Sequence, residues 1–192
     1  TAFRRDLRKM LKDTVEFGNI YKLQNWTNTI AGKEIADLHA KRNLDINHVF
    51  WLDNKGEEIY NWETDSKNSP HGNFEKRDYF RNIRDGNFYL LDDDPAKKFY
   101  LTQLISWTTG TFRTVMSIPS LLDSNKNEKN NHIVTAALSF NIKSLDNDVM
   151  PAGYGFALTD KQGKVLYHSD KTRNLNENLT EEFSAGEELR AC

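Results

Sequence analysis

Residues 49–60 read VFWLDNKGEEIY, and residues 156–167 read FALTDKQGKVLY. Both stretches contain an apolar run, a D-x-x-G turn and a second apolar run. Such a pattern predicts a β-hairpin, because the aspartate side chain caps the turn and the glycine adopts the positive φ that closes it. Superimposing the two turns pairs Asp53 with Asp160, Gly56 with Gly163 and Tyr60 with Tyr167.

A hairpin that recurs at this distance suggests two similar units in tandem. The second unit has only about 40 residues, which is too few for an independent core. We therefore expect the chain to be a fragment that holds one nearly complete unit and the start of another.

The composition describes an ordinary soluble globular protein of 192 residues, with 38% hydrophobic and 28% charged residues. A net charge of -2 gives no overall attraction to nucleic acid or to anionic membranes. No apolar run approaches the length of a membrane span, and no signal peptide is visible. The single cysteine, Cys192, excludes an intrachain disulfide and suits either the cytosol or the periplasm. The abrupt ends leave room for flanking transmembrane helices in the parent protein.

Residues 1–46 are expected to form one long helix, because apolar residues recur there in steps of three and four. The opposite face begins with several basic residues. It is either a membrane-proximal face or an ordinary solvated one. The apolar seam consists of Phe3, Leu7, Met10, Phe17, Tyr21, Ala31, Ile35 and Leu38.

The middle of the chain predicts an antiparallel sheet of about five strands with helices on one face, an α+β fold. Its strands are the first hairpin at 48–62 and the segments 101–108, 111–118 and 133–141, which are rich in Thr, Val, Ile and aromatic residues. A short helix is expected at 76–84. Asp94 and Pro95 have the pattern of a helix start. In the second unit, Thr180 is the expected N-cap of a helix at 180–190.

The order of these elements and five short motifs resemble the double Cache sensor domains of bacterial receptors, which carry two PAS-like units on one long helix. The motifs are RDYF at 77–80, SWTTG at 106–110, VMSIP at 115–119, GYGF at 153–156 and YHSD at 167–170. The resemblance implies a long N-terminal helix at 1–46 and a membrane-distal PAS-like unit at 47–145. A linker and the start of a truncated membrane-proximal unit would occupy 146–192.

The resemblance also implies an extracytoplasmic ligand sensor without catalysis, held between transmembrane helices ahead of a histidine kinase, chemoreceptor or cyclase output. In amino-acid-binding members, an R-x-[WY]-[FY] segment contacts the ligand carboxylate and an Asp on the last strand binds its ammonium. Here Asn141 stands near the position where that Asp would be expected, and a neutral amide does not balance a buried ammonium. A carboxylate without an amine, or another small polar ligand, therefore fits better. The expected ligand-binding residues are Arg77, Tyr79, Phe80, Trp62, Ser106, Trp107, Met116, Ser139 and Asn141.

Each of these residues also has a purely structural interpretation. Arg77 is either a bidentate clamp on a carboxylate or the partner of Asp78 or Glu75 in a surface ion pair. Tyr79 and Phe80 either wall a pocket or pack a short helix onto the core. Trp62 and Trp107 either cover a ligand or belong to the core, where tryptophan in a strand is more often found.

Other chemistries find little support in the sequence. The five histidines are scattered, so no zinc site is expected, and Asp92, Asp93 and Asp94 lack the spacing of a calcium loop. No P-loop, G-x-S-x-G or H-E-x-x-H motif is present, and no cofactor is expected. His168, Ser169 and Asp170 are interpreted as turn residues.

The ligand is expected to shift the sheet or its covering loops relative to the long helix, by binding one arrangement better than the other. The long helix would carry the shift to the membrane through homodimer contacts of Phe3, Leu7, Met10 and Phe17. The alternative is a scaffold or protein-interaction module that does not switch.

Overall fold

The computed structural model describes residues 2–19, 28–42, 46–64, 71–91, 94–106, 110–119, 133–140, 142, 145 and 152–182. The chain divides into two compact units, residues 1–142 and residues 143–192. None of the helices in the described ranges is long and apolar enough to cross a membrane.

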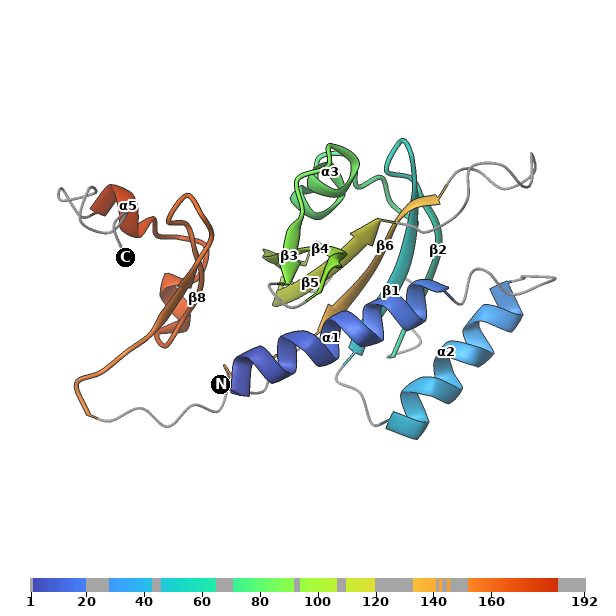
Figure 1. Ribbon diagram of the computed structural model, residues 1–192, viewed down its shortest axis with the longest axis horizontal. Coiled ribbons are helices and arrows are strands. Elements are labelled where there is room, and N and C mark those ends of the chain that lie inside the picture. The colour runs from blue at the N-terminus through green and yellow to red at the C-terminus, as the bar shows by residue number, and fades with distance from the viewer. Residues whose placement is uncertain are drawn as a thin grey trace. The chain divides into compact units, whose positions relative to one another are not determined.

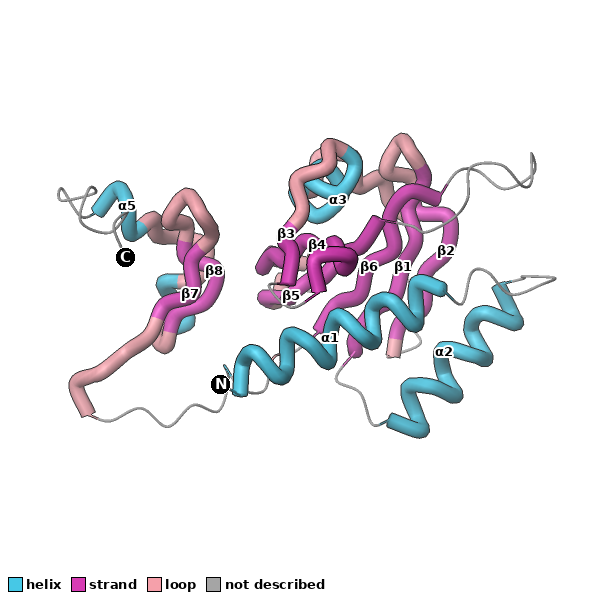
Figure 2. Tube along the Cα trace, in the orientation of Figure 1, coloured by secondary structure: helices cyan, strands magenta, loops and turns pink. Residues whose placement is uncertain are grey.

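The first unit is built on a six-stranded antiparallel sheet with the strand order β2-β1-β6-β5-β4-β3 (Figures 1 and 2). The sheet places β1 beside β6, so the first hairpin pairs with the strand that ends the unit. The strands are β1 (Ile46–Asp53), β2 (Glu58–Glu63), β3 (Tyr89–Leu91), β4 (Asp94–Ile105), β5 (Phe112–Pro119) and β6 (Ile133–Phe140).

Helices cover both faces of this sheet, so the expectation of helices on one face is wrong. Helix α1 (Ala2–Asn19) contacts β5 and β6 on one face, and α3 (Asp78–Arg84) contacts β4, β5 and β6 on the other (Figure 1). The reason is the alternation of side chains along β1, which is apolar on both sides. Trp51 faces α1 and donates from its indole nitrogen to the carbonyl of Gly18 at 3.5 Å, while Phe50 and Leu52 pack with the residues of α3.

The expected single long helix is also wrong, because α1 and α2 (Asn28–Arg42) are separate helices that run in different directions (Figure 1). A continuous helix of about 40 residues would extend about 60 Å. The longer strands of this sheet extend only about 25 Å, so one straight helix could not bury the whole of its apolar seam on the sheet. The seam residues Met10 and Phe17 are 6% and 0% exposed within their own unit, which removes them from the expected dimer contact.

The Asp94–Pro95 segment begins strand β4, so the expected helix start is a further correction. Leu91 of β3 pairs with Asp94, and Tyr100 of β4 pairs with Ser117 of β5. Pairing on both sides of β4 outweighs the local N-cap signature. The same pairing adds strand β3, which the sequence did not predict, so the sheet has six strands instead of the expected five.

The repeated hairpin is confirmed, and the two turns use the same chemistry. Asp53 Oδ1 accepts hydrogen bonds from the backbone N–H groups of Lys55 at 2.8 Å and Glu57 at 2.9 Å. Asp160 Oδ1 accepts from two backbone N–H groups at 2.9 and 3.0 Å in the second turn. Gly56 has φ +78° and Gly163 has φ +85°, as the turns require.

Replacing Gly56 with alanine is expected to lower the free energy of unfolding of the first unit by about 2 kcal/mol. Positive φ costs a residue with a Cβ about 1 kcal/mol, and the new Cβ would lie 2.6 Å from the backbone nitrogen of Glu75. Gly86 is the matched control, because it has φ +79° but a Cβ added there would meet no atom within 4 Å. Urea unfolding followed by circular dichroism should show about half the loss for Gly86→Ala. Equal losses in the two variants would contradict the close approach of the turn at Gly56 to the backbone of Glu75.

The second unit is a small hairpin, β7 (Ala157–Thr159) and β8 (Val165–His168), followed by a 3-10 turn η2 (Lys171–Arg173) and helix α5 (Leu179–Glu182). Asp170 caps η2 by accepting from the N–H of Thr172 at 3.0 Å, which confirms turn chemistry for this segment. Helix α5 is capped by Asn178, whose Oδ1 accepts from the N–H of Thr180 at 3.0 Å. The expectation of Thr180 as the cap is therefore wrong by two residues.

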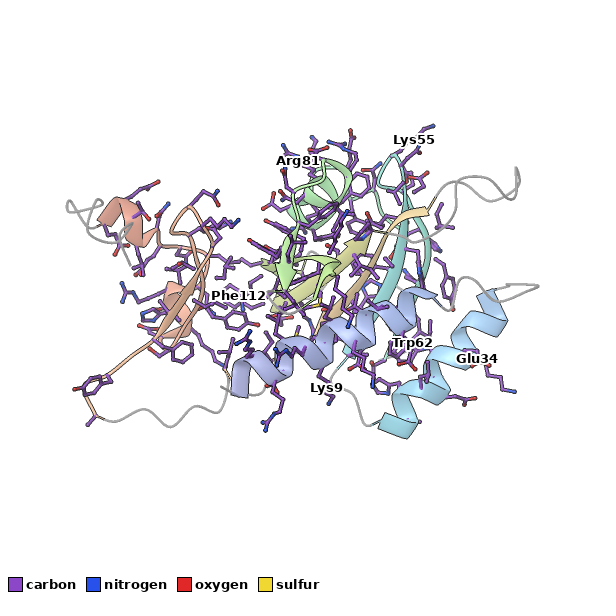
Figure 3. All side chains as sticks on the ribbon, viewed as in Figure 1. Lys9, Glu34, Lys55, Trp62, Arg81 and Phe112 are labelled. Atoms are coloured by element: carbon purple, nitrogen blue, oxygen red, sulfur yellow. The ribbon has the colours of Figure 1, made fainter. Side chains whose placement is uncertain are left out.

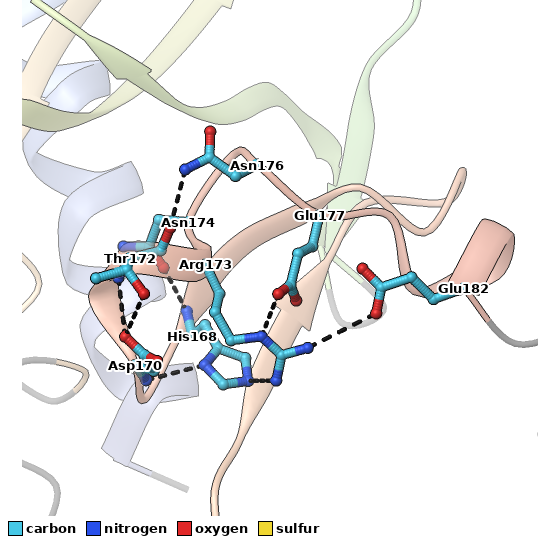
Figure 4. A network of polar contacts seen from close by, with 8 residues as sticks. All are labelled: His168, Asp170, Thr172, Arg173, Asn174, Asn176, Glu177 and Glu182. Carbon is cyan, nitrogen blue, oxygen red and sulfur yellow. Dashed lines mark hydrogen bonds and ion pairs between the residues drawn. The ribbon is translucent and has the colours of Figure 1, made fainter.

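Arg173 joins the parts of the second unit (Figure 4). Its guanidinium bonds the carboxylate of Glu177, lies 3.7 Å from that of Glu182 and contacts His168 Nε2 at 3.1 Å. The hydrogen bond to Glu177 is the main cause that raises the pKa of Arg173. These two ion pairs and the contact with His168 connect β8, η2 and α5 within the second unit.

Candidate functional site

Helix α3 places the RDYF residues directly over the central strands. Ser117 of β5 is fully buried and donates from Oγ to the carbonyl of Tyr79 at 2.9 Å. Ala137 of β6 lies in the same cluster, and such small side chains allow the helix to approach the sheet closely. Arg77 precedes the helix in an extended conformation, and Gly86 follows it at positive φ. The local sequence thus fixes both ends of the helix.

A row of aromatic rings packs between α3 and the sheet. Phe50 lies at the centre of the row, with ring centroids 4.7 Å from His48, 5.6 Å from Tyr79 and 6.0 Å from Phe74. Tyr79 meets Phe50 edge to face and lies 6.2 Å from Phe74. Phe80 is fully buried beneath the same helix, so it packs the helix onto the core.

Arg77 is half-buried at one end of this row. Its Nη2 donates to the carbonyl of Ile105, at the end of β4, over 3.5 Å. Burial lowers the pKa of Arg77, and the nearby Tyr79 and Asp78 act in the opposite direction. A guanidinium remains charged at physiological pH despite such a shift. The site therefore holds a partly desolvated, permanent positive charge.

Tyr79 lies between charges of opposite sign. Burial raises the pKa of its phenol strongly; the positive charge of Arg77 lowers it and the negative charge of Glu58 raises it. The hydroxyl is therefore neutral throughout the physiological range and able both to donate and to accept a hydrogen bond.

A cluster of four ionisable side chains lies near Tyr79, and the sequence did not predict it. The cluster consists of Glu58, His48, Glu63 and His71. His48 Nε2 lies 3.6 Å from Glu58 Oε1 and 3.8 Å from Glu63 Oε1, and His71 Nδ1 lies 3.8 Å from Glu58 Oε2. Strand alternation was the available signal, because it places His48 on the same side of β1 as Phe50. Across the part of the chain that the structure describes, no group of three or more such residues is arranged to hold a metal ion.

The structure gathers four of the predicted ligand-binding residues on the α3 side of the sheet: Arg77, Tyr79, Phe80 and Ser139. Ser139 of β6 pairs with Val115, a member of the α3 cluster, and with His48. Ser106 follows Ile105 and closes the turn between β4 and β5, because its carbonyl accepts from Gly110 at 2.9 Å.

Trp62 and Met116 lie on the opposite face, so the expectation that they join this site is corrected. Trp62 pairs with Val49, and its ring centroid lies 5.4 Å from that of His39 on α2. Arg81, which belongs to α3, lies on the other side of the sheet (Figure 3). Met116 pairs with Leu138, the residue that also pairs with Val49. Trp107 and Asn141 lie outside the described residues.

No protein-family model and no curated protein matches the chain by sequence. Solved structures with a similar fold are nevertheless found. The ligand-binding domain of the Pseudomonas fluorescens chemoreceptor CtaA, in complex with L-leucine, matches with a TM-score of 0.63 and 13% identity, over 95% of this chain and 70% of that one. The ligand-binding domain of the Pseudomonas aeruginosa amino acid chemoreceptor PctC, in complex with GABA, gives a TM-score of 0.57 and 15% identity, over 96% and 75%.

The extracellular domain of a protein described as a histidine kinase, vpHK1S-Z8, matches with a TM-score of 0.56 and 13% identity, over 97% of this chain and 70% of that one. Identities this low establish the fold and nothing finer. The chain has the α+β fold of the ligand-binding sensor domains of chemoreceptors and histidine kinases, which confirms the fold implied by the double Cache resemblance.

Proposed function

We propose that the chain is an extracytoplasmic ligand-sensing domain of a transmembrane receptor, and that its first unit binds a small polar or carboxylate ligand between α3 and the sheet. The observation that carries the proposal is the half-buried guanidinium of Arg77 beside the buried phenol of Tyr79. A planar, partly desolvated guanidinium is suited to bidentate recognition of a carboxylate. The sensor-domain fold supports the same assignment.

In this proposal the chain binds and releases its ligand unchanged. Arg77 anchors the carboxylate, the Tyr79 hydroxyl adds a hydrogen bond, and Ser139 and Ser106 supply further hydroxyls. Phe50 and Phe74 provide apolar walls, and Phe80 supports the helix from below. Trp107 and Asn141 stay proposed ligand contacts on the strength of the resemblance alone.

The proposed organisation follows the receptors of this fold. Residues 47–145 form the membrane-distal unit, residues 146–192 begin the membrane-proximal unit, and transmembrane helices flank the domain in the parent protein. Ligand binding shifts the population between two arrangements of α3 and its loops. The α1 and α2 helices, which pack on the other face of the sheet, pass this shift toward the membrane, with or without a homodimer.

A thermal-shift screen of the chain against small carboxylates, amino acids, amines and sugars tests this function. A ligand that binds the folded state raises the melting temperature by mass action. Tyr79→Phe is expected to weaken a hit about tenfold, the value of one hydrogen bond in a desolvated site. Tyr60→Phe is the matched control, because it removes a buried hydroxyl from the opposite face of the sheet. Silence across the library, or equal losses in both variants, would contradict the proposed function.

A further inference from the structure

Glu58 is a buried carboxylate, and the described residues around it leave one of its oxygens without a donor. Its side chain is 1% exposed, and Oε2 accepts from the N–H of Gly72 at 3.3 Å. Oε1 is fully buried and has no hydrogen-bond partner among the described residues. A buried charge with an unused oxygen is costly, so such an atom calls for a partner beyond the described residues of the chain.

His48 is the neighbour that faces this oxygen. Its Nε2 lies 3.6 Å from Glu58 Oε1 and 3.8 Å from Glu63 Oε1, and it too has no hydrogen-bond partner among the described residues. The side chain of His48 is 23% exposed, so the ring lies between the buried carboxylate and solvent. Both contacts are too long for hydrogen bonds, which leaves His48 a loosely held counter-group.

His71 has a different role. Its Nδ1 lies 3.1 Å from the carbonyl of Glu58, so this nitrogen donates to the backbone. The backbone N–H of Glu58 in turn donates to the carbonyl of Gly72 at 3.1 Å, and Phe74 N–H donates to the carbonyl of Gly56 at 2.8 Å. These bonds tie the segment that leads into α3 to the first hairpin. His71 therefore holds the loop in place, whereas His48 is the group that a ligand could replace beside Glu58.

We propose that Glu58 and Glu63 form a subsite for a primary ammonium group, and that a ligand ammonium and the proton of His48 compete for it. The inference rests on the proposed function, since it adds a second pole to the same site. Arg77 at one end and Glu58 at the other both act on the Tyr79 phenol, so positive and negative charges flank this hydroxyl. Such a site suits a zwitterion, a small amino acid or ω-amino acid.

Glu58 also changes the expectation drawn from Asn141. The last strand lacks a carboxylate near its end, but β2 supplies one on the α3 side of the sheet. A carboxylate with a free buried oxygen offers an ammonium what a neutral amide does not.

Competition between the ligand ammonium and the proton of His48 would make the ligand affinity depend on pH. When His48 gains its proton, the imidazolium becomes the counter-ion of Glu58 and excludes the ligand ammonium. Imidazoles change charge between pH 5 and 8, so affinity should fall as the pH falls through this range, by at most about tenfold per unit for one competing proton. Among the described residues, the other ionisable groups of this cluster are Glu63 on β2 (beside His48), His71 on the loop and Tyr79 on α3, with Arg77 beyond Tyr79.

The test uses two zwitterions and their deaminated twins: L-leucine with 4-methylpentanoate, and 4-aminobutyrate with butyrate. Isothermal titration of the whole 192-residue chain is carried out from pH 5 to pH 8 in two buffers that differ in ionisation enthalpy. At least one zwitterion is expected to bind at pH 7.5, at least tenfold more tightly than its twin, and to release a proton on binding at acidic pH. Glu58→Gln should abolish the preference, and His48→Gln should keep it while removing the pH dependence.

Glu34→Gln is the matched control, because Glu34 is exposed on α2 and contributes nothing to this face (Figure 3). Circular dichroism establishes that each variant is folded; the proton release of the unaltered chain decides the matter even if Glu58→Gln does not fold. Twins that bind as tightly as their zwitterions, through Arg77, would overturn the inference and leave the proposed function standing. Failure of all four probes to bind would overturn the inference, and silence across the thermal-shift library as well would overturn the proposed function.

Discussion

Replacing Trp51 with alanine is expected to lower the free energy of unfolding of the first unit by about 4 kcal/mol, the usual cost of removing a large buried aromatic side chain. Trp51 is fully buried, its ring stacks on Tyr60 at 5.6 Å, and its indole nitrogen donates to the carbonyl of Gly18. The substitution therefore removes packing within the sheet and the polar link to α1 in one step. Urea unfolding followed by far-ultraviolet circular dichroism measures the change.

Trp62→Ala provides the comparison, because Trp62 lies on the same face but is only partly buried. Its loss should cost about half as much, since partial burial gives proportionally less transfer free energy. Equal costs for the two tryptophans would contradict the packing of α1 over Trp51.

Replacing Arg77 with alanine is expected to weaken binding of a carboxylate ligand at least 100-fold, which corresponds to about 3 kcal/mol for a charge-assisted bidentate contact in a partly desolvated site. The guanidinium lies near Ile105 and Tyr79, where burial strengthens its interaction with an incoming anion. Isothermal titration with a carboxylate found in the thermal-shift screen measures the loss.

Arg81→Ala is the matched control for Arg77, because Arg81 lies on the exposed side of the same helix (Figure 3). It removes the same charge from α3 but no proposed contact, so affinity should change less than twofold, within the range of a screened surface charge. If both variants weakened binding alike, Arg77 would act through the net charge of the helix. The proposed clamp would then be discarded.

Local chemistry made the two hairpins and helix α3 predictable. The two hairpins follow from Asp53, Gly56, Asp160 and Gly163, whose side chains and φ angles define a turn over a few residues. Helix α3 was predicted within two residues for the same reason, since Gly86 ends it locally. The sensor fold followed from the order of such elements.

Features set by long-range packing were less predictable. Alternation divides each strand into two sets of side chains, but it does not reveal which set lies beneath α3. Met116 and Ser117 are neighbours in one motif, so alternation places them on opposite faces. Only the packing of α3, seen in the hydrogen bond from Ser117 to the Tyr79 carbonyl, shows that Ser117 is the one beneath the helix. The break between α1 and α2 depends likewise on the size of the sheet. Glu58 was overlooked because a charged residue beside a turn ordinarily faces solvent.

The proposed ligand position between α3 and the sheet can be mapped residue by residue. Backbone amide chemical shifts would be recorded with and without a ligand identified by the thermal-shift screen. The largest changes are expected at residues 77–80 and at Ser139, with little change at Trp62 and Met116. Changes centred on Trp62, Met116 and α2 would instead place the ligand on the opposite face of the sheet and refute the proposed site.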